Sequence, residues 1–135
     1  MRAAGDRYNE IGRSYAATRK EDPRIARAIF AGIGSTGTVL NVGAGAGSYE
    51  PRACNVVALE PSVQMILQRS EGAAPTVRGV AESLPFSTGS FDAAMAVLTM
   101  HHWSDPSAGI REMRRVARRQ VVLYFEPLRA RNETS

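Results

Sequence analysis

The stretch TVLNVGAGAGS, residues 38–48, decides the fold of this chain. An apolar run at 38–42, predicted as a buried strand, leads directly into Gly43, Gly45 and Gly47 at alternate positions. Glycine lacks a Cβ, so the backbone can turn sharply out of a strand and approach a ligand closely. Glu60 stands at the end of the next apolar run, where a ribose would lie. The pattern predicts a site for a nucleoside-bearing cofactor.

Short apolar runs predict five strands in all, at 38–42, 55–59, 76–80, 93–98 and 121–125. Asp22-Pro23 predicts the start of a helix that stops at Gly32, and Ser62 predicts a cap for a helix that ends near Gly72. A third helix starts at Asp105-Pro106. Because the runs lack period-2 alternation and helices separate them, we expect an α/β fold, a Rossmann-like three-layer α/β/α sandwich with a mostly parallel sheet.

The spacing of the glycines narrows the ligand class. A dinucleotide fingerprint places its third glycine three residues after the second, at position 48, but Ser48 stands there and the third glycine is Gly47. No Gly-Lys-Ser/Thr sequence follows, which argues against a nucleoside triphosphate loop. The connection to the second strand is also short and contains Pro51, so we expect any helix in it to have at most about one or two turns.

Length and composition favour one domain over residues 1–135, because 135 residues with 44% hydrophobic content suffice for one core of ordinary size. We expect a lid-like segment at 1–22 and the Rossmann-like core at 23–135. A single cysteine, Cys54, excludes an internal disulfide, and no leader or long apolar span is visible, which predicts a cytoplasmic setting without a membrane. No zinc-type Cys/His spacing exists, so no metal is expected.

Four stretches together resemble the class I S-adenosylmethionine-dependent methyltransferases, in the small-molecule, type 11-like branch that includes quinone and secondary-metabolite methyltransferases. They are VLNVGAGAGS at 39–48, VALEPS at 57–62, VAESLPF at 80–86, and SFD at 90–92 followed by LTMHHW at 98–103. The resemblance spans residues 38 to 127. It implies S-adenosylmethionine as the cofactor and a small organic molecule as the methyl acceptor.

The resemblance assigns roles to several positions. Glu60 would hold the ribose hydroxyls, Ala81 and Glu82 would meet the adenine with Met65 or Leu84 against the ring, and Arg24 would join the lid. Asn41 stands where this family commonly has an acid, near the methionine amino group. The implied cofactor-binding residues are Tyr15, Arg19, Asn41, Gly43, Ala44, Gly45, Gly47, Glu60, Pro61, Met65, Ala81, Glu82, Val97, Leu98 and His101.

The catalytic group is left open. His101 and His102 are candidates for a general base because histidine titrates near neutrality. The alternative is that they only shape the cofactor pocket, since methyl transfer to an activated acceptor needs little more than alignment of donor and acceptor. Arginines at 111, 115 and 118 on a helix predicted over 110–119 are interpreted as a solvated face, because no aromatic residues interleave with them as in a nucleic-acid binder.

The resemblance also concerns the end of the chain. Related domains continue beyond the fifth strand with two more strands and much of the acceptor pocket, whereas this sequence stops at Ser135. We therefore expect a sheet truncated after the fifth strand, whose exposed edge is a template for a homodimer. Two functions stay open: a methyltransferase for a small acceptor, or an S-adenosylmethionine-binding domain without turnover of its own.

Overall fold

The computed structural model describes residues 21–34, 37–47, 49–52 and 54–123. Its elements follow the predicted alternation of strands and helices. In chain order they are α2 (Pro23–Ile33), β1 (Thr38–Val42), β2 (Asn55–Leu59), α3 (Val63–Leu67), β3 (Thr76–Val77), β4 (Phe91–Val97), the 3-10 helix η1 (Met100–His102), α4 (Pro106–Val116) and β5 (Ala117–Leu123).

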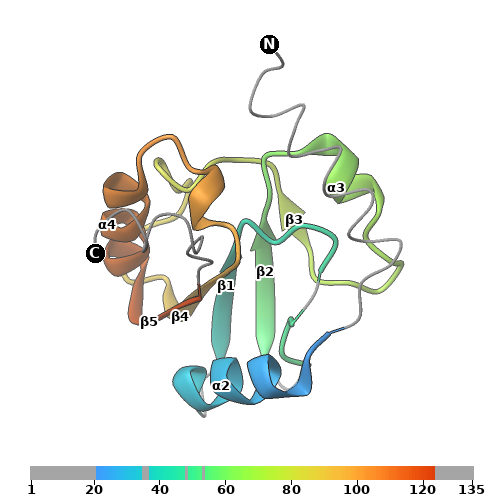
Figure 1. Ribbon diagram of the computed structural model, residues 1–135. Coiled ribbons are helices and arrows are strands. Elements are labelled where there is room, and N and C mark those ends of the chain that lie inside the picture. The colour runs from blue at the N-terminus through green and yellow to red at the C-terminus, as the bar shows by residue number, and fades with distance from the viewer. Residues whose placement is uncertain (1–20, 35–36, 48, 53, 124–135) are drawn as a thin grey trace, which may run out of the picture.

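The strands form one five-stranded sheet in the order β3-β2-β1-β4-β5 (Figure 1). Every pairing is parallel, as the sequence predicted. The strand order changes direction at β1, which pairs with β2 on one side and β4 on the other. In open parallel sheets, ligands bind beyond the carboxyl ends of the strands at such a switch point. The fold therefore places the loops after β1 and β4 at the expected ligand site.

Helices cover both faces of the sheet, which confirms the predicted layers. On one face, Ile29 and Ile33 of α2 pack with Val39 and Met95. On the other face, Met113 of α4 belongs to a buried cluster with residues of β1, β2 and β4. Each fully buried side chain of this size contributes about 1.5–3 kcal/mol to folding.

The predicted helix starts are confirmed by their caps. The Asp22 side chain accepts a hydrogen bond from Arg24 N, Ser62 Oγ accepts one from Met65 N at 3.2 Å, and Asp105 Oδ1 accepts one from Ala108 N at 3.2 Å. The predicted ends differ slightly. Helix α2 runs one residue beyond Gly32 before Gly34 ends it, and α3 stops well before Gly72.

Several predicted elements were wrong in their extent. Strand β4 covers Phe91–Val97 rather than 93–98, and β5 begins at Ala117 rather than at 121. Strand β3 covers Thr76–Val77 rather than 76–80, and beyond it the hydrogen bond from Gly79 N to Glu60 O is long, at 3.4 Å. The helix predicted over 110–119 ends at Val116, where Ala117 takes an extended conformation and begins β5. Arginines 118 and 119 therefore lie on a strand, not on the helix.

The arginine prediction was wrong in a second respect. Arg115 donates to Leu84 O at 3.0 Å and to Phe86 O at 2.9 Å, and it pairs with Glu112 on its own helix. It therefore ties α4 to the segment at 84–86 rather than standing in a solvated row.

No helix forms between β1 and β2 among the residues described there. Tyr49 has a φ of 65° and Pro51 follows it, and neither position is compatible with continuing a right-handed helix. The Tyr49 side chain is buried, and its hydroxyl accepts a hydrogen bond from Asp22 N at 2.7 Å. The connection is thus a turn anchored to the start of α2.

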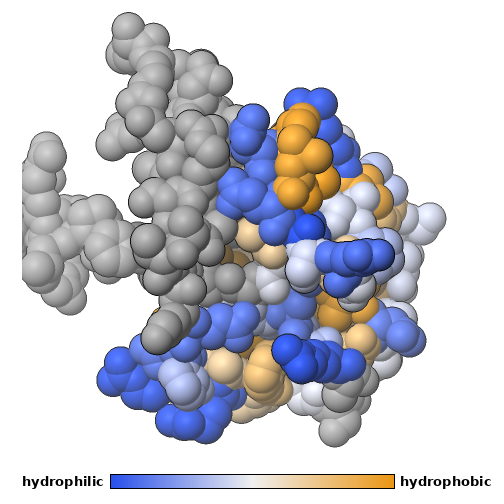
Figure 2. Space-filling model, turned by 90° about the vertical axis from the view of Figure 1, so that its right-hand side faces the viewer, coloured by the Kyte–Doolittle hydropathy of each residue, from blue (hydrophilic) through white to orange (hydrophobic). Residues whose placement is uncertain are grey.

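The face around α3 and β3 carries several exposed large apolar side chains, namely Val63, Leu67, Val77 and Val80. Figure 2 views this side of the molecule and shows that its apolar surface is interrupted by polar residues. In the described part of the chain, no helix has the length and apolarity needed to cross a bilayer.

Candidate functional site

The glycine loop after β1 adopts the backbone geometry that its sequence predicts. Gly43, Gly45 and Gly47 have φ values of 70°, 56° and 105°, all in the region that favours glycine. Their N–H groups are used within the protein: Gly43 N and Ala44 N donate to Leu59 O at 2.8 and 2.9 Å, and Gly47 N donates to Ala44 O at 3.1 Å. The loop is therefore fastened to the end of β2 and is not an open cradle for phosphate.

Glu60, the predicted ribose ligand, lies at the centre of the site and is fully buried. Its Oε1 accepts a hydrogen bond from Gly45 N at 2.7 Å, and its Oε2 accepts one from Ser62 N at 2.8 Å. One carboxylate thus links the loop after β1 to the residue that caps α3. Because the side chain is covered, a ligand that reaches it must displace protein atoms.

The loops after β1 and β4 meet at Gly43 and Thr99. Leu98 has a φ of 55°, and this turn directs the buried Thr99 side chain toward Gly43. A Cβ on Gly43 would overlap the Thr99 side chain. Glycine is needed at position 43 to leave room for the Thr99 side chain, a requirement that the sequence analysis missed. Val97 and Leu98, two predicted cofactor contacts, are brought to this junction.

The predicted adenine side is arranged around Glu82. Ala81 is buried, while the Glu82 carboxylate accepts hydrogen bonds from Ser104 Oγ and Asp105 N, both at 3.0 Å. Burial raises the pKa of Glu82, but these hydrogen bonds outweigh it and hold the pKa below its ordinary value. Glu82 therefore fastens the start of α4, and its contact with adenine stays a prediction.

Asn41 belongs to a polar cluster under the glycine loop. It is buried, and its Nδ2 donates to Glu50 Oε2 at 2.8 Å. Glu50 in turn pairs with Arg69, whose side chain is 5% exposed, at 2.8 Å. Arg69 also donates to Gly45 O and Ala74 O, both at 3.3 Å. Glu50 and Arg69 were missed by the sequence analysis, because no motif links residues so far apart.

The remaining predicted residues are scattered around this centre. Met65 is buried within α3, and Pro61 is exposed, just before the residue that caps α3. Arg24 pairs with Asp22 at 3.0 Å in an exposed ion pair, so the structure engages it at its own helix cap rather than at the site. Tyr15 and Arg19 lie outside the described residues.

The two histidines follow β4 in η1. His101 is exposed and His102 is half-buried, with their ring centroids 4.1 Å apart. His102 N donates to Thr99 O at 2.9 Å, so η1 is tied to the junction with Gly43. Of the two rings, His101 is therefore more accessible to an incoming molecule.

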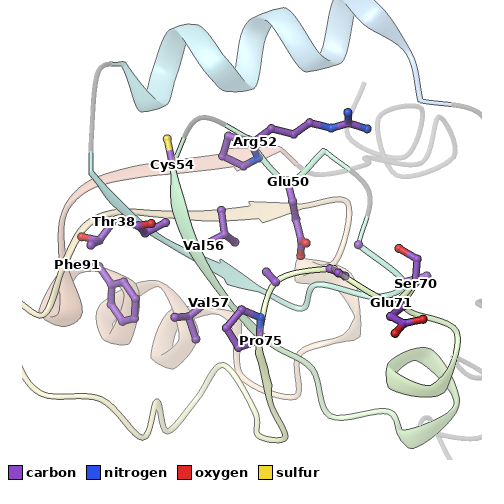
Figure 3. Close-up of a pocket in the computed structure, with 17 residues that line it drawn as sticks. Thr38, Glu50, Arg52, Cys54, Val56, Val57, Ser70, Glu71, Pro75 and Phe91 are labelled. Atoms are coloured by element: carbon purple, nitrogen blue, oxygen red, sulfur yellow. The ribbon is translucent and has the colours of Figure 1, made fainter.

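A separate open pocket of about 760 Å³ follows the outer edge of β2 (Figure 3). It is lined by Ala46 and Gly47, by the residues around Glu50 and Val56, and by the segment at 70–75. It exists because β3 is too short to pair with the first half of β2. Glu60 and Leu98 do not line it, so this pocket is distinct from the strand-end site.

The charges at the strand ends suit a ligand without phosphate. The described part of the site presents the carboxylates of Glu60 and Glu82, and its arginine, Arg69, is already paired with Glu50. An adenosyl sulfonium carries a diol and a positive charge, which carboxylates accept. No group of three or more His, Cys, Asp or Glu residues able to hold a metal occurs among the described residues.

A family model described as a methyltransferase domain matches residues 40–125, from β1 to the end of the described sheet. The chain belongs to this methyltransferase family. Its members are class I S-adenosylmethionine-dependent methyltransferases of type 11, the family that the four sequence stretches resembled. The matched range contains Glu60, the glycine loop and the junction of Gly43 with Thr99.

Individual methyltransferases show the same relationship. The chain is 34% identical over 104 residues to the uncharacterized methyltransferase YcgJ of Bacillus subtilis (strain 168), covering 66% of this chain and 41% of that protein. It is 42% identical over 72 residues to a demethylmenaquinone methyltransferase of Mycolicibacterium vanbaalenii, covering 51% of this chain and 32% of that protein.

A solved structure from Anabaena variabilis ATCC 29413, described as a candidate methyltransferase from an antibiotic biosynthesis pathway, has the same fold. It superposes with a TM-score of 0.71 and is 29% identical, covering 78% of this chain and 47% of that one. The chain thus spans less than half the length of these methyltransferases.

Proposed function

We propose that this chain binds S-adenosylmethionine at the carboxyl ends of β1, β2 and β4 and transfers its methyl group to a small organic acceptor. The observation that carries the proposal is the position of Glu60. Its carboxylate is buried directly beneath the glycine loop and held there by Gly45 N and Ser62 N. A fixed acceptor beside a close-approach loop is what recognition of a ribose diol requires.

The residues of the chain fit such a ligand in three respects. Hydroxyls of a ribose would join or displace the hydrogen bonds of Glu60, each charge-assisted bond contributing about 1.5–3 kcal/mol. Ala81 and Met65 offer apolar surface on the side predicted for the adenine. Asn41 and Glu50 lie under the loop, on the side predicted for the methionine end.

The bound sulfonium supplies an electrophilic methyl group. The chain has to hold donor and acceptor in line and exclude water, which accounts for much of the rate of such transfers. Gly43, Leu98 and Thr99 set the path of the chain into η1, and the exposed His101 of η1 would accept a proton from the acceptor. His101 is therefore our candidate for proton transfer, and His102 for shaping the pocket.

A small acceptor is supported by the names of the relatives. One relative is named for demethylmenaquinone, and a structural neighbour is described with an antibiotic biosynthesis pathway. Both names concern small organic molecules. The second candidate function is binding of S-adenosylmethionine without turnover, and the descriptions of the matched proteins as methyltransferases favour turnover over it.

A methyl-transfer assay distinguishes the two functions. The chain is incubated with labelled S-adenosylmethionine and separate acceptors: a reduced quinone, a phenol and an amine. Transfer to one of them that is lost in Glu60→Gln supports the proposal. Binding of the donor without transfer to any acceptor supports the binding-only function. A His101→Gln variant that binds the donor normally but transfers more slowly would place the proton acceptor at His101.

A further inference from the structure

Three segments that are distant in sequence meet at Glu50. Asn41 comes from β1, Glu50 from the turn after the glycine loop, and Arg69 from the residues just after α3. Both Glu50 oxygens are occupied: Oε1 accepts from Arg69 at 2.8 Å, and Oε2 accepts from Arg69 at 3.0 Å and from Asn41 at 2.8 Å. In Figure 3 the Glu50 side chain points inward from its turn, whereas Arg52 points away.

The Arg69 guanidinium extends this cluster to the glycine loop. It donates to Gly45 O at 3.3 Å, and Gly45 N donates to Glu60 Oε1 at 2.7 Å. The N–H of Gly45 is thus held by the buried Glu60, and its carbonyl by the largely covered Arg69. A Cβ on Gly47 would lie 3.4 Å from Arg69 Nη1 and 3.5 Å from Glu50 Oε1, so the loop rests directly on the ion pair.

In its described residues, the connection between β1 and β2 lacks the helix that usually joins two parallel strands. Adjacent parallel strands are usually joined through a crossover helix. The described residues between β1 and β2 contain no helix. The ion pair of Glu50 with Arg69 lies against this loop, and both side chains are largely covered, 12% and 5% exposed.

We propose that Glu50 and Arg69 are positioning residues for the cofactor: they fix the orientation of the Gly45 peptide relative to Glu60 and so set the shape of the nucleoside site. The proposal rests on the proposed function, because it concerns the same site. Neither residue needs to touch the ligand. Their effect passes through Gly45, the residue that both charged groups hold.

The same contacts explain why position 41 carries an amide. An aspartate there would place two carboxylates within about the same 2.8 Å that now separates Asn41 Nδ2 from Glu50 Oε2. Like charges at that distance are strongly unfavourable in a buried site. Exchanging the amide and the carboxylate between positions 41 and 50 restores a donor–acceptor pair. An aspartate at 41 can accept from the side-chain NH₂ of a glutamine at 50, and the glutamine oxygen can still accept from Arg69.

Arginine is also specifically required at position 69. Its two terminal nitrogens reach three acceptors, Glu50, Gly45 O and Ala74 O, which a compact ammonium cannot bridge in one geometry. Its Nε is buried without a hydrogen-bond partner. The molecule therefore tolerates one unsatisfied buried donor in keeping this side chain in place.

The test uses isosteric variants: Asn41→Asp, Glu50→Gln and the double exchange of both. Arg118→Met is the matched control, because it removes an exposed ion pair, with Asp92 at 3.2 Å, on the far edge of the sheet. The dissociation constant of S-adenosylhomocysteine, the donor product, is measured by calorimetry at a temperature where each variant is folded. In parallel, the amide signal of Gly45 is followed by NMR without ligand.

We expect each single variant to bind about tenfold more weakly, the double exchange to recover to within about threefold of the original chain, and the control to be unchanged. The Gly45 amide signal should shift in both single variants and return in the double exchange. Single variants with lower melting temperatures but unchanged affinity and unchanged Gly45 signal would overturn the proposal, since the pair would then only stabilise the fold.

Two further outcomes are decisive. If a single variant does not fold, the double exchange decides alone: binding within about threefold supports the proposal, and a loss of tenfold or more contradicts it. If the original chain does not bind the probe, the proposed function fails. The positioning claim is then decided by whether the Gly45 signal moves in the single variants and returns in the double exchange.

Discussion

Gly45 donates its backbone N–H to Glu60 Oε1 at 2.7 Å, which joins the loop after β1 to the residue that follows β2. The bond forms because Gly45 adopts a φ of 56°, which turns its amide toward the neighbouring strand end. Glu60 is fully buried there, so its charge is fixed by backbone N–H groups rather than by water. The acid and the loop form one unit, and a change in either should alter both stability and ligand affinity.

The contact between Gly43 and Thr99 predicts a strongly destabilising Gly43→Ala variant. The new Cβ would overlap Thr99, and alanine is strained at a φ of 70°. Gly89→Ala is the control, because Gly89 has the same φ and a Cβ added there would meet no atom within 4 Å. Urea denaturation should show a loss of about 1 kcal/mol for Gly89→Ala and about 1–3 kcal/mol more for Gly43→Ala. Equal losses would show that the Thr99 contact is unimportant.

The hydrogen bonds of Glu82 predict a pH-dependent contribution to stability. Its pKa is lowered in the folded state, so its contribution is present above the unfolded pKa of about 4.3 and is lost as the pH falls through the folded value. Glu82→Gln should cost about 0.5–1.5 kcal/mol at neutral pH. Denaturation curves at pH 7 and pH 3 should show this difference shrinking. A constant difference, or an equal effect of the exposed Glu71→Gln, would contradict the assignment.

The edge of β5 predicts self-association. Leu98 N donates to Leu123 O, so the odd-numbered residues of β5 direct their backbone groups toward β4 and the even-numbered ones point away. Gln120→Pro therefore removes an outward N–H and leaves the pairing with β4 in place. Sedimentation should show a homodimer for the original chain and a monomer for this variant. A folded chain that is monomeric at every concentration would contradict the prediction.

The different exposure of the two histidines predicts that one variant affects turnover and the other affects cofactor binding. His101→Gln should leave the affinity for S-adenosylhomocysteine within about twofold and lower the methyl-transfer rate by about 10²-fold or more. His102→Gln, which changes the half-buried ring of the pair, should instead weaken binding. Steady-state kinetics at several donor concentrations measure both effects. Equal rates for His101→Gln and the original chain would exclude proton transfer at His101.

Much of the fold follows from local signals in the sequence. The bounds of β1 and β2 match the predicted 38–42 and 55–59, because continuous apolar runs bounded by turn residues mark buried strands clearly. The helix starts follow from capping by Asp22, Ser62 and Asp105, which acts within a few residues. The positions of Glu60 and the glycines were likewise readable, because short motifs set them.

The parts that were missed depend on contacts between distant residues. The end of α4 at Val116 is set by the pairing of Ala117 with Phe91, since the run of arginines itself is compatible with a helix. The ion pair of Glu50 with Arg69 joins positions 19 apart in the chain. Neither residue stands in a motif. The roles of Gly43 and Gly47 as spacers for protein side chains also became clear only from the packed structure.

Calorimetric titration of the chain with S-adenosylmethionine, beside Glu60→Gln, is the sharpest test of the proposed cofactor site. We predict saturable binding of one donor molecule per chain to the original protein and an affinity at least about tenfold weaker in the variant. The melting temperature of the variant, measured in parallel, shows that it is folded at the temperature of the titration. No heat of binding to the original chain at about millimolar donor, or equal affinities for both proteins, would contradict the proposed role of Glu60 and the glycine loop.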